Sequence, residues 1–103
     1  MKYPKDQDLT QIGNEVLNLA RAKGFPITKD ATGFLIERVC LEAKEIQESF
    51  KNDEASEHTA EECIDVIVQC IQLIKVLGYD PADIYRKKMD TNWQRKWDLS
   101  KLK

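Results

Sequence analysis

The sequence predicts an all-α fold of four helices, in a single domain that spans residues 1–103. Three observations support this prediction. Apolar residues recur at helical spacing along most of the chain, and no stretch of useful length alternates like a β-strand. Glycine and proline interrupt that pattern at Gly24–Pro26 and again between Gly78 and Pro81. No linker is long enough to divide domains, and no repeat of solenoid period occurs.

The first helix is predicted to run from residues 6–8 to Lys23. Its apolar stripe comprises Leu9, Ile12, Val16, Leu17 and Ala20. Gly24 suits a C-terminal cap, and Pro26 prevents the helix from continuing. The second helix is predicted from residues 28–30 to about Lys51. Its apolar face comprises Leu35, Ile36, Val39, Ala43, Ile46 and Phe50.

The third helix is predicted to begin at Thr59, where Thr59 and Glu62 fit a capping box, and to end at Gly78. Eleven of the fifteen residues 63–77 are apolar. Such a helix is hydrophobic around most of its circumference, and one four-helix chain cannot cover all of it. We therefore expect a bundle completed by oligomerisation, as a homodimer or homotetramer.

The fourth helix begins at Asp80-Pro81, with aspartate as N-cap and proline at the first helical position, and is predicted to reach about Trp97. Lys88, Asn92 and Arg95 are spaced i, i+4, i+7 and share one helical stripe. Two cations and an amide suit phosphate oxygens. For this helix taken alone, a solvated charged face is the commoner explanation.

Composition limits the classes of partner and the cellular compartment that we expect for this protein. The net charge is −2 with 33% charged residues, so no basic excess favours nucleic acid. No apolar stretch is long enough for a membrane span, and residues 1–8 are too polar for a signal peptide, so we expect a cytoplasmic protein. Cys40, Cys63 and Cys70 show no C-x-x-C spacing, which predicts core thiols. His58 is predicted to be a solvated loop residue, with a position at the mouth of the site as the less favoured alternative.

Two acidic pairs are the strongest functional signal. Glu42-x-x-Glu45 and Glu62-x-x-Asp65 each place two carboxylates on one helix face. If residues 51–58 join antiparallel helices, Glu45 lies about 9 Å before the connection and Glu62 about 5–6 Å after it. The two pairs therefore come level to within about one helical turn.

Four converging carboxylates repel one another unless cations lie among them, and oxygen-only ligands favour Mg²⁺, with Mn²⁺ as a possible substitute. The alternative is a simple solvent-facing stripe of acids and amides. This stripe comprises Glu61, Glu62, Asp65, Gln69 and Gln72. No lysine or arginine interleaves it, and a second carboxylate pair faces it. The combination favours a site.

In this order and spacing, the motifs resemble the all-α nucleoside triphosphate pyrophosphohydrolases, in particular the short MazG-like and dCTP-pyrophosphatase-like members. The motifs are Glu42-x-x-Glu45, Glu62-x-x-Asp65, Gly78-Tyr79-Asp80 and Lys88-Met89-x-x-Asn92-x-x-Arg95. The resemblance covers about residues 34–97 and implies a MazG-like bundle. It also implies Mg²⁺-dependent cleavage between the α and β phosphates, which gives a nucleoside monophosphate and pyrophosphate.

By the same resemblance, Glu42, Glu45, Glu62 and Asp65 would be metal ligands and catalytic residues, whereas Lys88, Asn92 and Arg95 would hold phosphates or nucleotide. Two positions depart from the family. Leu41 stands where many relatives have glutamate, and Gln69 stands where the dCTP type often has tyrosine. The resemblance therefore fixes neither the metal count nor the base preference.

An apolar slot for the base is expected as well, for which Phe25, Phe34 and Trp93 are candidates, although a place in the core is the commoner role for each. Gln69 is a further candidate for substrate binding. Two alternatives remain open from the sequence. One is a non-catalytic helical module that associates through the third helix. The other is an enzyme of the same architecture that acts on phosphoribosyl-ATP.

Overall fold

The computed structural model describes residues 8–52 and 55–101, and these residues contain four α-helices and no strand. The helices are α1 (Leu9–Lys23), α2 (Thr32–Lys51), α3 (Ser56–Val76) and α4 (Pro81–Gln94). Two short 3₁₀ turns, η1 (Lys29–Ala31) and η2 (Leu99–Lys101), complete the elements. The all-α prediction is confirmed.

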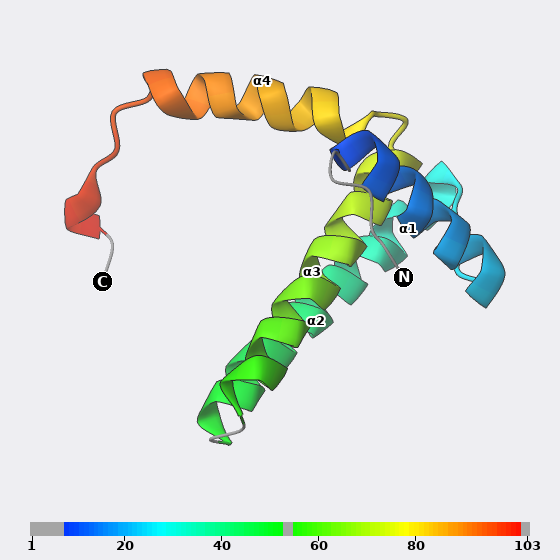
Figure 1. The fold of residues 1–103 in the computed structure, drawn as a ribbon, viewed down its shortest axis with the longest axis horizontal. Coiled ribbons are helices and arrows are strands. Elements are labelled where there is room, and N and C mark those ends of the chain that lie inside the picture. Colours follow the sequence, from blue (N-terminus) through cyan, green and yellow to red (C-terminus); the bar gives the residue numbers. More distant parts are fainter. Residues whose placement is uncertain (1–7, 53–54, 102–103) are drawn as a thin grey trace.

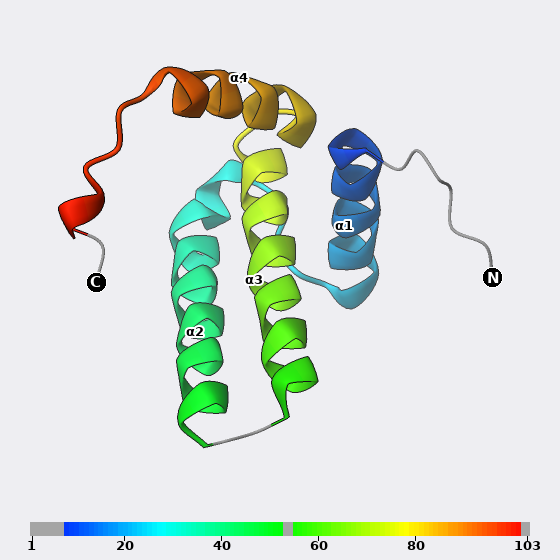
Figure 2. The same cartoon turned by 60° about the vertical axis from the view of Figure 1, so that its left-hand side comes forward.

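The centre of the fold is an antiparallel hairpin of α2 and α3, which lie side by side along their length (Figures 1 and 2). Figure 2 shows α1 on the side of α3 away from α2. The buried apolar side chains are Val16, Ala20, Leu35, Ile71 and Val76. They come from α1, the start of α2 and the end of α3, so the core lies at the end of the hairpin where α1 packs.

Helix α4 leaves the same end of α3 and extends away from the hairpin (Figure 1). Its N-terminus is fixed to α1, because Thr10 Oγ1 donates to the Asp80 carboxylate at 3.0 Å from both oxygens. The two helices meet at Gly13, where an added Cβ would lie 3.1 Å from Pro81 Cγ. The start of α4 is therefore anchored, while the rest of the helix projects outward.

The predicted C-terminal cap of α1 and the predicted N-cap of α4 are confirmed, and α1 also has an N-cap at Asp8 that was not predicted. The Asp8 side chain accepts from the Gln11 backbone N–H at 3.0 Å, and the Asp80 side chain accepts from the Ala82 N–H at 3.1 Å. Gly24 ends α1 with φ +78°, a conformation that glycine adopts without steric cost. These local signals need no tertiary contact to act, which explains why the sequence predicts them well.

Two other helix ends were predicted wrongly. Helix α3 begins at Ser56 rather than Thr59, and no side chain caps it at Ala55. Thr59 is therefore inside the helix, and its Oγ1 lies 2.8 Å from Ser49 Oγ on α2 instead of forming the predicted capping box. Helix α4 ends at Gln94 rather than Trp97, and Arg95 is already extended, with φ −78° and ψ 137°.

Several residues predicted to be interior are exposed. Ile36 and Phe50 on α2 are 48% and 80% exposed, because no described element packs against that side of the hairpin. Cys40 and Cys63 are also exposed and Cys70 is half-buried, so the prediction of core thiols is wrong for the first two within one chain. None of the described helices has the length and apolar character that a membrane crossing requires.

Candidate functional site

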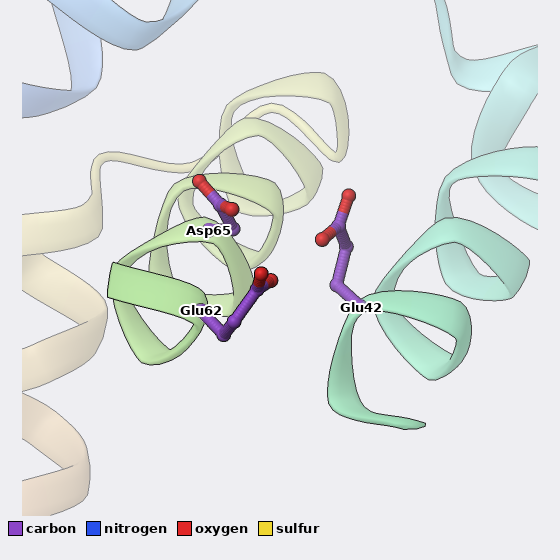
Figure 3. Close-up of side chains that lie close together, drawn as sticks. All are labelled: Glu42, Glu62 and Asp65. Carbon is purple, nitrogen blue, oxygen red and sulfur yellow. The ribbon is translucent and has the colours of Figure 1, made fainter. Parts of the chain in front are cut away.

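Three carboxylates from the two hairpin helices converge near the middle of the hairpin. Glu42 projects from α2 toward Glu62 and Asp65 on α3 (Figure 3), and one oxygen from each lies within 4.8 Å of the others. Glu62 and Asp65 lie three residues apart on one face of α3, and the antiparallel pairing brings Glu42 level with them. The convergence predicted from spacing is present for these three residues.

Glu45, the fourth predicted carboxylate, lies beside this group. Its negative charge and its hydrogen bonding raise the pKa of Glu42 and the pKa of Glu62. Glu45 therefore acts electrostatically on the glutamates of both helices, and we count it with the other three as the carboxylate cluster.

Burial is the main cause of the altered acidity in this cluster. Desolvation is the largest cause that raises the pKa of Glu42, repulsion from Glu45 is the next largest, and the charge of Arg38 opposes the rise. The pKa of Glu62 is raised by desolvation and then by Glu45, while His58 opposes it. Both side chains are largely covered, with exposed fractions of 18% and 14%.

Glu62 also has an unsatisfied atom. Its Oε2 is shielded from solvent and has no hydrogen-bond partner among the described residues. A buried carboxylate oxygen without a donor is costly, and either a proton or a cation removes that cost. The donor set, all carboxylate oxygen, fits a hard divalent cation.

Because of this cluster, we expect the free energy of unfolding to fall as the pH rises above the ordinary glutamate pKa of 4.5. The unfolded chain loses these protons near that pH, whereas the folded chain keeps them until the raised pKa values are passed. In that window the folded state binds more protons, so deprotonation destabilises it. Thermal melts from pH 4 to 7 should show a flatter profile for the double variant Glu42→Gln/Glu62→Gln than for wild type. Identical profiles would contradict the raised pKa values of Glu42 and Glu62.

The cluster has two basic neighbours, of which sequence analysis missed Arg38 and assigned His58 to a solvated loop. His58 lies in the first turns of α3 rather than in a loop, and its Nε2 is 3.1 Å from Glu62 Oε1. Arg38 on α2 places its Nη2 3.7 Å from Glu42 Oε1. Each base is four residues before a cluster glutamate, on the same helix face, and this i, i+4 spacing is the signal that could have revealed both.

Comparison of the chain with protein-family models, curated proteins and solved structures finds no match in any of the three. Function is therefore inferred from the carboxylates and their neighbours.

Of the predicted substrate-binding residues, Gln69 and Phe25 lie close to the cluster. Arg38 contacts both of these residues. Its Nε donates to Gln69 Oε1 at 3.3 Å, and its Cζ is 4.7 Å from the centre of the Phe25 ring. A further contact fixes the loop that contains Phe25, because Gln72 Nε2 donates to the Pro26 carbonyl at 3.3 Å. Phe34, a further apolar candidate, lies on α2 and is 49% exposed.

The residues predicted on α4 are not brought to the cluster within one chain. Glu62 is fourteen residues before the end of α3, or about 21 Å, and α4 projects outward from there (Figure 1). The predicted stripe of Lys88, Asn92 and Arg95 does not form, because Arg95 lies beyond the helix and stacks on Trp97 at 4.2 Å. Trp93 is 83% exposed.

Asn92 nevertheless shares one property with Glu62. Its Oδ1 is shielded and has no hydrogen-bond partner in the described part of the chain.

Proposed function

We propose that the protein is a Mg²⁺-dependent nucleoside triphosphate pyrophosphohydrolase that cleaves a (d)NTP to the monophosphate and pyrophosphate, in nucleotide-pool house-cleaning. The main support is the cluster of Glu42, Glu62 and Asp65, with Glu45 against both glutamates. The motif order, which resembles that of the MazG-like enzymes, supports the same assignment.

In this proposal the four carboxylates hold Mg²⁺, for which Mn²⁺ can substitute. The bound metal would neutralise the triphosphate, polarise the α-phosphate and lower the pKa of a water molecule. A carboxylate of the cluster accepts the proton of the attacking water. The water oxygen bonds to the α-phosphorus, the bond from that phosphorus to the bridging oxygen breaks, and pyrophosphate leaves with the electron pair.

Calorimetric titration with Mg²⁺ tests the first requirement of this proposal. We expect saturable binding that is lost in Glu62→Gln and retained in Glu61→Gln, which removes an exposed carboxylate one position away. A non-catalytic helical module, the main alternative, would bind no Mg²⁺ saturably. An enzyme for phosphoribosyl-ATP would bind Mg²⁺ and release pyrophosphate from that compound in preference to (d)NTPs.

We further propose that the working unit is a homodimer or a dimer of dimers. Ile64 and Ile67 on α3 are 57% and 49% exposed, and Leu19 on α1, the helix beside α3, is 50% exposed. The radius of gyration, 15.8 Å, exceeds the roughly 13 Å of a compact domain of this length. A second copy would cover these apolar side chains, and its α4 could then approach a neighbouring carboxylate cluster.

Lys88→Ala and Arg95→Ala are each expected to lower kcat/KM by about tenfold and to leave Mg²⁺ affinity unchanged, because these cations would contact phosphate rather than metal. Since α4 lies away from the cluster of its own chain, the effect depends on a partner chain. Mixed oligomers of Lys88→Ala and Asp65→Ala chains should regain part of the lost activity. Unchanged kcat/KM in both single variants would show that Lys88 and Arg95 do not contact substrate and belong to a solvated charged face of α4.

A further inference from the structure

Arg38 is held in one place by three separate contacts at the edge of the carboxylate cluster. Its guanidinium lies over the Phe25 ring at 4.7 Å, and its Nε donates to Gln69 Oε1 at 3.3 Å. The side chain is 28% exposed. An arginine so fixed loses little further conformational entropy when it binds a ligand.

The outer edge of this guanidinium remains available for hydrogen bonding. The contact of Nη2 with Glu42 Oε1, at 3.7 Å, is an ion pair but is too long for a hydrogen bond. Nη1 donates no hydrogen bond to any of the described residues. The two Nη groups therefore present a planar set of donors next to the carboxylates, while stacking and the Nε hydrogen bond hold the other side of the group.

The location of the two Nη groups, beside the carboxylate cluster, indicates which kind of ligand they would bind. Arg38 is one helical turn from Glu42, on the same face of α2, so any group that the carboxylates hold through a divalent cation lies within reach of it. A phosphate group bound to that cation presents oxygens that match the guanidinium fork bidentately. Phe25 then serves as a platform for Arg38 rather than as a slot for the base.

We propose that Arg38 binds the phosphoryl oxygens of the substrate from the same chain as the carboxylates, in addition to the basic residues that α4 of a partner chain would supply. This inference rests on the proposed function, because it takes the carboxylates as the cation site. It predicts that the loss of Arg38 weakens phosphate binding selectively, whereas a purely structural role predicts a loss of folding stability with no selective effect on phosphate.

Isothermal calorimetry with two probes, Mg²⁺ alone and inorganic pyrophosphate in the presence of Mg²⁺, separates these roles. Arg38→Ala should weaken pyrophosphate binding by about 10- to 100-fold and leave Mg²⁺ affinity equal or tighter, since a competing cation near Glu42 is removed. Arg38→Lys, which keeps the charge but not the planar fork, should lose less than Arg38→Ala. Arg21→Ala, an exposed arginine of α1, is the matched control.

Each outcome decides the proposal. If the wild type binds both probes and Arg38→Ala and Arg38→Lys bind pyrophosphate as the wild type does, the role of Arg38 is overturned and the proposed function stands. If the wild type binds neither probe, both fall together. Should Arg38→Ala not fold, Arg38→Lys decides alone, and an affinity for pyrophosphate equal to that of the wild type contradicts the proposal.

Discussion

Replacement of Glu45 or Asp65 by alanine is expected to reduce turnover of a nucleoside triphosphate by about a thousandfold or more, while the helical fold stays intact. Asp65 belongs to the group of three carboxylates within 4.8 Å, and Glu45 contacts the glutamates of both helices. In the proposed mechanism, removal of either one would take a metal ligand or the proton acceptor from the reacting centre and raise the barrier by about 4 kcal/mol. Steady-state kinetics with circular dichroism measures both parts.

The same substitutions should not destabilise the protein in the absence of divalent cations. Loss of one of several repelling carboxylates removes an unfavourable interaction, so the melting temperature is expected to rise by a few degrees. Glu61→Ala is the matched control, because Glu61 precedes Glu62 on α3 but is exposed and outside the group. It should change neither activity nor stability noticeably. Full activity in Glu45→Ala or Asp65→Ala would exclude that residue from the site.

The second large effect concerns assembly. We expect the wild type to sediment at two or four times its chain mass of 11.9 kDa, and the double variant Ile64→Glu/Ile67→Glu to sediment as a monomer. In a two-fold contact each substitution occurs twice, so four charges would enter one apolar interface. Sedimentation equilibrium at micromolar concentration makes the measurement.

A control separates this interface from general surface hydrophobicity. Leu99→Glu changes an apolar side chain of η2 that is 67% exposed and distant in sequence from α3, and it should leave the oligomer unchanged. A wild type that sediments only at 11.9 kDa would refute the assembly, and so would a double variant that assembles like wild type.

Local signals account for the parts of the structure that sequence analysis predicted. The caps at Gly24 and Asp80 act within one turn, so they mark helix ends without any tertiary information. The convergence of Glu42 with Glu62 follows from helical spacing and one short connection between antiparallel helices. Both inferences need only helix geometry and a hairpin.

The errors arose where contacts distant in sequence decide the outcome. The outward direction of α4 depends on Thr10 and Gly13 of α1, which no periodicity in α4 reveals. Arg38 acquires its importance from Phe25 and Gln69, which approach it from a loop and from another helix. Ile36 lies on an apolar stripe, but a stripe does not say whether another element of the chain packs against it.

Hydrolysis in ¹⁸O-enriched water, followed by ³¹P NMR of the products, is the most direct test of the central claim. With Mg²⁺ and a panel of canonical and modified (d)NTPs, we predict equal amounts of monophosphate and pyrophosphate from at least one substrate. The ¹⁸O should appear in the monophosphate, since water attacks the α-phosphorus. Release of orthophosphate only, or of no product across the panel, would contradict the assignment.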